Sequence, residues 1–494
     1  FLMFDFQFVT IDRRKKASLT AQVYHEIRSA ILSGRLNGGT RIPSSRILAE
    51  QIGVSRTTIL SVLDQLIAEG YLTTKQGSGT FVCAEFPLEE EAFNKTICRT
   101  NESGAHAQEF SKWSHLAQSI EPYSFLYAGD IQPFRSGLPA LDTFPVDQWL
   151  RVWRQSWQVA QAPDLWYRSP IGCADLRNQV AKYLSAHRGV KCESDQVILM
   201  GGTAQILDLI ARLMIEKGDS VFVENPGFTS ARQIFTVNGA TLKPLLVDKQ
   251  GAVLPRNSIT KQRDKFVSLT PSHQFPLGVT MSIDRRLEWL EWARKTECLI
   301  IEDDYDSEFR YAEKPVPAMQ GLDRGQNVIY IGSFSKVVYP SLSMAYAVVP
   351  PRLCDTIKKA CSVLCRPPSS TDQAALERFI RHGYFLRHVR RLRRTHRQRH
   401  DVFVEQMNEL LSDKIRLSGT DAGLHCIGHL LSRKISDVAL CARISELNLH
   451  CKPLSEYYLP GTPSDQVQQG LVMGFAGSKP NAIRSAIRKL AKAI

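Results

Sequence analysis

Five short apolar runs constrain the fold of this chain more than any other feature. They are QVILM (196–200), SVFVE (220–224), KFVSL (265–269), CLIIE (298–302) and NVIYI (327–331). Each is a near-continuous hydrophobic stretch of strand length, which is typical of strands that are covered on both faces in a mainly parallel sheet. We therefore predict an α/β domain built on a mainly parallel sheet.

A loop rich in polar residues follows each of these runs. In chain order the loops contain GGT, NPGF, PSHQ, DDYDSE and GSFSK. In sheets of this kind ligands bind outside the carboxyl ends of the strands. The five loops therefore predict a ligand site at one edge of the sheet.

Charge and composition divide the chain into three segments. Residues 13–83 hold ten Lys and Arg against four Asp and Glu, a net charge of +6, whereas residues 84–126 hold seven Glu against three Lys and Arg. We expect a small basic domain, an acidic linker and a large α/β domain over residues 127–494. The net charge of the whole chain, +13, indicates a polyanionic partner.

The composition also disfavours several classes of protein. Eleven cysteines without a CxxC pair argue against a disulfide framework and a zinc site. No apolar run reaches the length of a membrane span. In the opening FLMFDFQFVTIDRRKK the apolar residues precede the charges, the reverse of a secretory signal. We expect a cytoplasmic protein that does not enter a membrane.

Residues 44–82 predict a winged helix-turn-helix. Ser44 or Ser45 caps a first helix that Gly53 ends, and a second helix runs from Ser55 to Gly70. YLTTKQGSGTFV then reads as a two-stranded wing with glycines at its tip. The exposed start of the second helix, Ser55, Arg56, Thr57 and Thr58, suits insertion into the major groove of DNA. A small helical domain with a solvated basic face is the alternative.

A family resemblance supports the DNA-binding interpretation. IRSAILSGRLNGGTRIPSSRILAEQIGVSRTTI resembles the DNA-binding domain of GntR-family transcription regulators. The resemblance implies DNA contacts at Arg46, Arg56, Thr57 and the wing residues Gln76 and Gly77. We expect a double-stranded operator as the partner.

Lys336, in SFSKVVYPSLSMAYAVVP, follows the fifth run. A lysine at the mouth of a buried site loses its proton readily and suits a Schiff base with an aldehyde cofactor, pyridoxal phosphate (PLP). PLP also needs an anion, a hydroxyl donor, a stacking ring and a phosphate cradle at a helix amino terminus. The residues that meet these needs are Asp303, Tyr305 and Phe228, and Gly202, Thr203 and Ser333 for the phosphate.

The large domain resembles class I aminotransferases of PLP fold type I, and with its GntR-like head it resembles the MocR subfamily of bacterial regulators. YRSPIGCADLR (167–177), TPSHQFPLGVTMSIDRR (270–286) and IIEDDYDSEFRY (300–311) carry the likeness. It implies that Lys336 is the Schiff-base lysine, Asp303 the partner of the pyridine nitrogen, Tyr305 the ring-hydroxyl donor and Phe228 the stacking ring. The departure is Ser343, where the subfamily usually has a phosphate-binding arginine.

Other interpretations of single motifs remain open. EDDYDSE could be a metal loop, but it lacks accompanying histidines, so we predict no metal site. His273 fits a hydrogen-bonded structural residue, and the arginine-rich run 387–400 fits a solvated helix at a dimer edge better than a second DNA surface. No residue is securely matched to a substrate carboxylate clamp; the candidates are Arg232, His450 and Lys452.

The combined expectation is a homodimeric, PLP-dependent transcription regulator that senses PLP or an amine through Lys336. Two alternatives stay open. One is a working aminotransferase that carries a DNA-binding domain. The other is a regulator that has lost PLP and uses the large domain only to dimerise.

Overall fold

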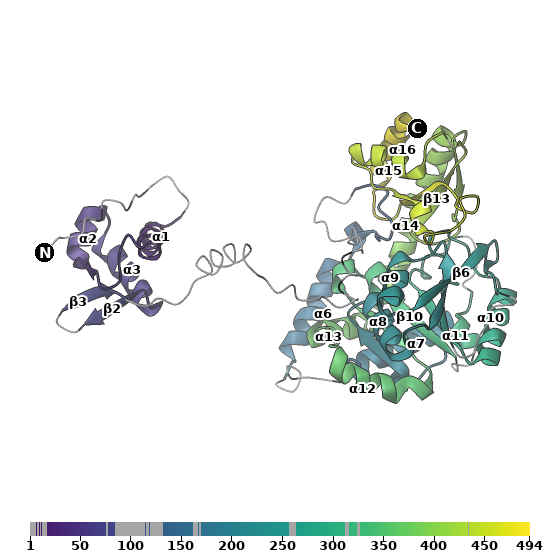
Figure 1. Cartoon of the computed structure of the whole chain (residues 1–494), viewed down its shortest axis with the longest axis horizontal. Coiled ribbons are helices and arrows are strands. Elements are labelled where there is room, and N and C mark those ends of the chain that lie inside the picture. The colour runs from purple at the N-terminus through teal and green to yellow at the C-terminus, as the bar shows by residue number, and fades with distance from the viewer. Residues whose placement is uncertain are drawn as a thin grey trace. The chain divides into compact units, whose positions relative to one another are not determined.

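The chain folds as two compact units, residues 1–109 and 110–494, which we call the head and the body (Figure 1). This computed structural model describes residues 17–75, 78–83 and 132–494, apart from gaps at 162–165, 167–168, 256–262, 312–315, 324–326 and 433. Outside these ranges it describes the single positions 6, 9, 11, 114 and 118. The wing residues Gln76 and Gly77 and nearly all of the predicted acidic linker therefore lie outside the described residues.

The head is a three-helix domain with a small antiparallel sheet. Its elements are α1 (Leu19–Leu32), β1 (Arg41–Ile42), α2 (Ser45–Ile52), α3 (Arg56–Ala68), β2 (Leu72–Lys75) and β3 (Gly79–Val82). Ser44 caps α2 and Ser55 caps α3, each by accepting a backbone N–H in the first turn. Gly53 ends α2 with φ 74°, a left-handed conformation that glycine adopts without strain.

Two features of the head were not predicted from the sequence. The first is α1, whose buried Val23, Ile27, Ala30 and Ile31 recur at helical spacing. The second is β1, which pairs with β3 and adds a third strand to the sheet, whereas the predicted two-stranded wing is present as the antiparallel pair β2 and β3. A two-residue strand of mixed polarity carries no pattern by which the sequence could reveal it.

The body is built on an eight-stranded sheet of order β4-β11-β10-β9-β8-β5-β6-β7. The strands are β4 (Val197–Met200), β5 (Ser220–Asn225), β6 (Thr241–Asp248), β7 (Gly251–Ala252), β8 (Asp264–Leu269), β9 (Leu299–Asp304), β10 (Val328–Ser333) and β11 (Ala345–Val348). β10, β9, β8, β5 and β6 run parallel to one another, while β11 and β7 are antiparallel to their neighbours. All five predicted strands are present, and the mainly parallel sheet is confirmed.

Helices cover both faces of this sheet. They are α6 (Val146–Gln158), α7 (Ala174–Arg188), α8 (Thr203–Met214), α9 (Thr229–Val237), α10 (Ile283–Thr296), α11 (Met319–Leu322), α12 (Cys354–Leu364) and α13 (Ser370–Arg381). One face packs on α8, α9 and α12 through alternate residues such as Ile198 and Ile329. The opposite residues, such as Leu199 and Tyr330, pack with α6, α7 and α13. Period-two alternation between two apolar layers explains why each strand is apolar throughout.

A smaller antiparallel sheet, of order β12-β13-β15-β14, completes the body. Its strands are β12 (Ile415–Ser418), β13 (His425–Leu430), β14 (Lys452–Pro453) and β15 (Gly470–Gly474), accompanied by α14 (Tyr384–Leu411), α15 (Asp437–Glu446) and α16 (Pro480–Ala493). No helix of the described chain is long and apolar enough to cross a bilayer.

The arginine-rich run 387–400 lies within α14 and is less solvated than its composition indicates. Arg399 is 3% exposed and donates to the carbonyl oxygen of Ala476 and to both carboxylate oxygens of Asp142. Arg393 donates to the carbonyl oxygen of Glu308. The predicted helix is present, but it is solvated only in part, because Arg393 and Arg399 join it to other segments of the body.

Candidate functional site

A cavity of about 400 Å³ opens at the carboxyl ends of β8, β9 and β10. This is the edge that the polar loops predicted. The residues that line it are Ser136, Gly137, Thr203, Ala204, Phe228, Ser230, Thr270, Phe275, Asp303, Tyr305, Ser333, Ser335, Lys336, Leu424 and His425. Six of the seven residues predicted to hold PLP are in this lining, and Gly202 directly precedes it as the N-cap of α8.

Lys336 reaches the cavity from a short 3-10 helix, Phe334–Lys336, that follows β10. Its Nζ donates a hydrogen bond to the carbonyl oxygen of Gly137 at 2.8 Å. Burial lowers the pKa of the Lys336 ammonium, and the carboxylates of Asp306 and Asp303 oppose that shift. A buried lysine of lowered pKa is the form of this side chain that attacks carbonyl groups.

Asp303 lies within β9. The sequence had instead indicated that it lies in the loop after this strand. Its side chain is buried, and its Oδ1 atom has no hydrogen-bond partner among the described residues. Burial and the neighbouring carboxylates Asp304, Asp306 and Glu224 raise the pKa of Asp303 to about 7, while Lys336 opposes them. An unpartnered buried carboxylate at a cavity wall is costly unless a ligand supplies a donor or a cation.

Tyr305 and Phe228 line two other parts of the cavity. The Tyr305 hydroxyl lies 3.0 Å from Nδ1 of His273, and burial raises the pKa of Tyr305 well above its ordinary value. Phe228, the N-cap residue of α9, packs edge-on against Phe275 with ring centroids 5.9 Å apart. Phe275 also contacts Tyr305 edge-on, so one aromatic residue supports both side chains.

The amino terminus of α8 faces the same cavity. Gly202 caps it with φ 142°, and Thr203 and Ala204 line the cavity beside Ser333 and Ser335. Free backbone N–H groups at the start of a 12-residue helix favour an anion. Ser343 is exposed and left-handed, with φ 46°, and it precedes β11 without lining the cavity. Its carbonyl oxygen would lie 3.9 Å from a Cβ atom added to Gly201.

The candidates for a carboxylate clamp differ in their surroundings. Arg232, on α9, is 5% exposed and donates through Nη2 to the carbonyl oxygen of Gly227, whereas its Nη1 has no partner within the described chain. Burial lowers the pKa of Arg232 to about 10. His450 precedes the two-residue strand β14 that holds Lys452. Arg232 is thus the candidate with unused hydrogen-bonding capacity beside the cavity loop.

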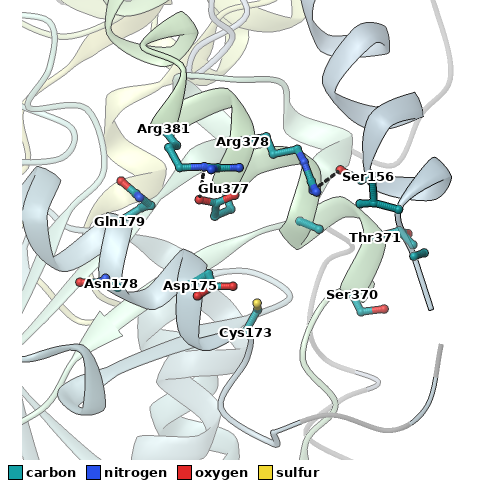
Figure 2. A pocket seen from close by; sticks show the side chains of 13 residues that line it. Ser156, Cys173, Asp175, Asn178, Gln179, Ser370, Thr371, Glu377, Arg378 and Arg381 are labelled. Atoms are coloured by element: carbon teal, nitrogen blue, oxygen red, sulfur yellow. Dashed lines mark hydrogen bonds and ion pairs between the residues drawn. The ribbon is translucent and has the colours of Figure 1, made fainter. Parts of the chain in front are cut away.

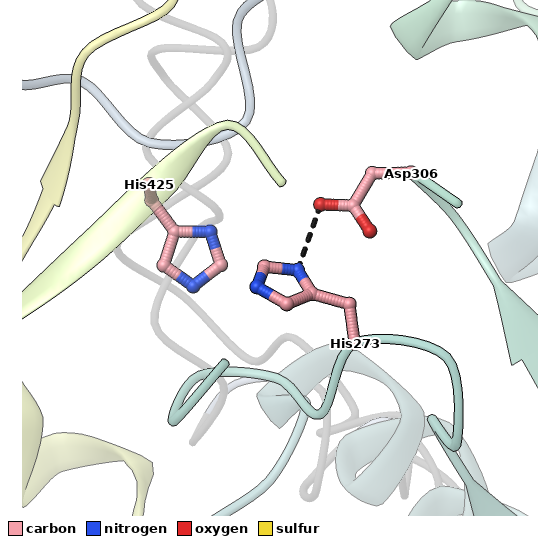
Figure 3. Close-up of side chains that lie close together, drawn as sticks. All are labelled: His273, Asp306 and His425. Atoms are coloured by element: carbon pink, nitrogen blue, oxygen red, sulfur yellow. Dashed lines mark hydrogen bonds and ion pairs between the residues drawn. The ribbon is translucent and has the colours of Figure 1, made fainter. Parts of the chain in front are cut away.

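A cluster of His273, Asp306 and His425 lies against the cavity (Figure 3). The three residues come from the loops after β8 and β9 and from the start of β13, so their proximity could not be read from the sequence. They supply the histidines that the EDDYDSE motif lacks. Nδ1 of His273 lies 2.9 Å from Asp306, and Nε2 of His425 lies 2.9 Å from the carbonyl oxygen of Pro276. These contacts make the cluster a hydrogen-bond network.

A second cavity of about 400 Å³ lies between the ends of α6, α7 and α13 (Figure 2). Both arginines of its lining already have side-chain partners. Arg381 forms an ion pair with Glu377 at 3.0 Å, and Arg378 donates to Ser156 at 3.2 Å. The first cavity instead brings together Lys336 and the Oδ1 atom of Asp303, which has no partner among the described residues, so we place the candidate site there.

The predicted DNA contacts that the structure describes divide into two groups. Arg46, Arg56 and Thr57 are exposed. The Ser55 hydroxyl instead accepts the Thr58 backbone N–H at 3.1 Å and lies 2.8 Å from the Thr58 hydroxyl. Arg56 also donates from Nε to the Ser45 hydroxyl, which fixes the guanidinium between the two helices. Ser55 and Thr58 therefore shape the start of α3, which presents Arg56 and Thr57, whereas Arg46 lies on α2.

The head and body together define a class of protein: a DNA-binding winged helix-turn-helix joined to an aminotransferase-like α/β domain. Residues 19–82 match the family model for bacterial regulatory proteins of the gntR family, and residues 134–489 match that for aminotransferase class I and II. The chain is 35% identical to the probable rhizopine catabolism regulatory protein MocR of Rhizobium meliloti, over 98% of this chain and 95% of that one. It is 29% identical to the pyridoxine biosynthesis transcriptional regulator PdxR of Corynebacterium glutamicum, over 98% of each.

The body also resembles solved aminotransferase structures. α-Aminoadipate aminotransferase from Thermus thermophilus superposes with a TM-score of 0.69 at 24% identity, covering 78% of this chain and 96% of that one. This likeness shows the fold. The chain belongs to the MocR subfamily of GntR-family transcription regulators, in which a helix-turn-helix domain precedes an aminotransferase-like domain.

Proposed function

We propose that this regulator senses PLP, or an amine effector through PLP, by a Schiff base at Lys336. The observation that carries the proposal is the presence of two complementary buried groups on one cavity. These are a lysine of lowered pKa and the unpartnered carboxylate oxygen of Asp303. PLP satisfies both, because its aldehyde reacts with an amine and its pyridine nitrogen gains a proton beside an anion.

The remaining lining supports the same ligand. Tyr305 would donate to the ring hydroxyl, Phe228 would stack on the ring, and Thr203 and Ser333 would bind the phosphate at the start of α8. Because Ser343 replaces a charge-assisted contact worth about 1.5–3 kcal/mol, we expect affinity for PLP about ten- to a hundredfold or more below that of a protein with arginine there. One curated relative is named as a regulator of pyridoxine biosynthesis, in keeping with PLP as the molecule sensed.

In the head, Arg46, Arg56 and Thr57 would contact the operator, with the wing around Gln76 and Gly77 on the adjacent groove. We propose a homodimer, whose symmetry would place two heads on paired half-sites. An effector amine that takes the place of Lys336 in the Schiff base would release the lysine, and this difference between the two states could shift DNA affinity.

An absorption titration with PLP tests the proposal directly. The parent should develop a saturable Schiff-base band, Lys336→Ala should not, and Lys359→Ala, an exposed lysine on α12, should behave as the parent. No saturable band in the parent, or an equal band in Lys336→Ala, would refute a Schiff base at this residue. The body would then serve as a dimerisation platform.

The same preparation distinguishes a regulator from an aminotransferase. Incubation with amino acids and a keto acid should give no sustained turnover, while PLP or an amine should change affinity for DNA selected in vitro by the protein. Sustained turnover at an enzyme-like rate would instead assign the body to catalysis.

A further inference from the structure

Tyr305 and its two neighbours, His273 and Asp306, form an ordered hydrogen-bond chain at the cavity wall. Nδ1 of His273 lies 2.9 Å from Oδ2 of Asp306 and 3.0 Å from the Tyr305 hydroxyl. His273 is 2% exposed and Asp306 1% exposed, so solvent cannot take the place of either partner. Nδ1 of His273 therefore lies within hydrogen-bonding distance of two oxygens, one from Asp306 and one from Tyr305.

The chemistry of these groups determines where the protons lie. A carboxylate only accepts hydrogen bonds, so the contact with Asp306 requires a proton on Nδ1 of His273. A protonated Nδ1 cannot accept the Tyr305 hydroxyl proton. The Tyr305 oxygen is therefore at most an acceptor toward His273, and its own O–H remains available for the cavity that Tyr305 lines.

We infer that Asp306 and His273 are positioning residues that orient the Tyr305 hydroxyl as a hydrogen-bond donor into the cavity. The inference rests on the proposed function, because the acceptor for that donor would be the ring oxygen of PLP. The raised pKa of Tyr305, caused first by burial and then by the carboxylates of Asp306 and Asp303, keeps the hydroxyl protonated and thus able to donate.

Two glycines leave room in the backbone for the side chains of His273 and Asp306. A Cβ atom on Gly423 would lie 2.0 Å from Cε1 and 2.5 Å from Nδ1 of His273, and 2.7 Å from Oδ2 of Asp306. On the other side, a Cβ on Gly278 would approach Nε2 of His273 to 3.2 Å. Both glycines also have positive φ, a conformation that glycine adopts without strain. Because neither carries a side chain, the two loops that contain them can lie close to the imidazole of His273.

The surroundings of the second ring nitrogen of His273, Nε2, are consistent with a proton on Nδ1. Nε2 of His273 is buried without a partner in the described structure and is directed toward His425 (Figure 3). Nε2 of His425 donates to the carbonyl oxygen of Pro276, and burial lowers the pKa of His425 to about 3. His425 therefore stays neutral and brings no second proton for Asp306 to accept.

The first test uses the protein without cofactor. Long-range ¹H–¹⁵N correlation spectra of histidine-labelled protein report which ring nitrogen carries the proton, and the His273 signal is identified by its loss in His273→Gln. We expect a protonated Nδ1 in the parent and a population with protonated Nε2 and bare Nδ1 in Asp306→Asn, whose amide can donate. A bare Nδ1 in the parent overturns the inference.

The second test uses the PLP-loaded protein. A hydrogen-bond donor to the ring oxygen of PLP stabilises the unprotonated Schiff base more than the protonated one. In the protonated form, the N–H of the Schiff base already offsets the negative charge of that oxygen. Loss of the donor should raise the pH midpoint of the absorption band by about one to two pH units, in Tyr305→Phe and in Asp306→Asn alike. Asp421→Asn, an exposed carboxylate on the segment before Gly423, is the matched control and should leave the midpoint unchanged.

A parent-like midpoint in Asp306→Asn beside a raised one in Tyr305→Phe would overturn the positioning role. If no absorption band forms in any variant, the proposed function has failed, and the tautomer measured without cofactor still decides the proton arrangement at His273. The two failures are therefore distinguishable.

Discussion

Replacing Asp303 by asparagine should stabilise the cofactor-free body at alkaline pH and weaken its binding of PLP. The Asp303 carboxyl is 7% exposed, has an unpartnered Oδ1, and has its pKa raised from 3.8 to about 7. Because the folded state holds this proton more tightly than the unfolded chain does, stability falls as pH rises from about 4 to about 7. Each pKa unit corresponds to about 1.4 kcal/mol, so the ionised carboxylate costs at most about 4 kcal/mol.

Asparagine has nearly the same shape and carries no charge. We therefore expect Asp303→Asn to raise the free energy of unfolding by about 2–4 kcal/mol at pH 8, and by less than about 1 kcal/mol at pH 4.5. The gain should be accompanied by weaker PLP binding, because the amide cannot stabilise a protonated pyridine nitrogen. Such an exchange of stability for function is common at binding sites.

Urea unfolding followed by tryptophan fluorescence measures this effect on the body alone. All seven tryptophans lie at or after residue 113, outside the GntR-type segment 19–82. Asp208→Asn, a half-buried carboxylate paired with Arg212 on α8, is the matched control, and it should show no gain at pH 8. A gain of equal size at pH 4.5 and pH 8, or a loss at pH 8, would contradict the electrostatic argument.

Three further substitutions test other parts of the structure. Arg399→Leu should destabilise the body by about 2–4 kcal/mol, since it leaves Asp142 and a buried carbonyl oxygen unpaired, whereas exposed Arg390→Leu on the same helix should change urea stability by less than about 0.5 kcal/mol. Ser55→Ala should lower the calorimetric stability of the head by about 1 kcal/mol through loss of the α3 cap, and exposed Ser61→Ala should not. Gly332→Ala should cost about 1–3 kcal/mol in urea unfolding, because its Cβ would lie 2.4 Å from the Tyr346 ring; a parent-like value would show that the ring moves freely.

Local patterns were sufficient for the framework of the protein. The five apolar runs predicted five strands of the parallel sheet, because a strand buried on both faces must be apolar along its whole length. Ser44, Gly53 and Ser55 marked the ends of the two helix-turn-helix helices, since capping is a contact within one turn. The strands of the carboxyl-terminal sheet were mostly missed, because several are short and combine polar with apolar residues.

For the candidate site, too, the sequence predicted some residues and could not predict others. Order along the chain sufficed to nominate Lys336, Asp303 and Tyr305, because the carboxyl ends of parallel strands meet at one edge. It could not show that Gly137 and His425 line the same cavity, since these come from segments outside the five predicted strand–loop units. Nor could it show that Ser343 is exposed and lies outside the cavity lining.

The sequence by itself determined the family, five strands of the large sheet, the two helices of the helix-turn-helix and the residue types available for chemistry. These follow from local periodicity, capping and motifs, each of which acts over a few neighbouring residues. Only the tertiary structure decided that Oδ1 of Asp303 has no partner among the described residues and that His273 lies between Asp306 and Tyr305. Proton positions and desolvation depend on groups that lie far apart in the chain and close together in the fold.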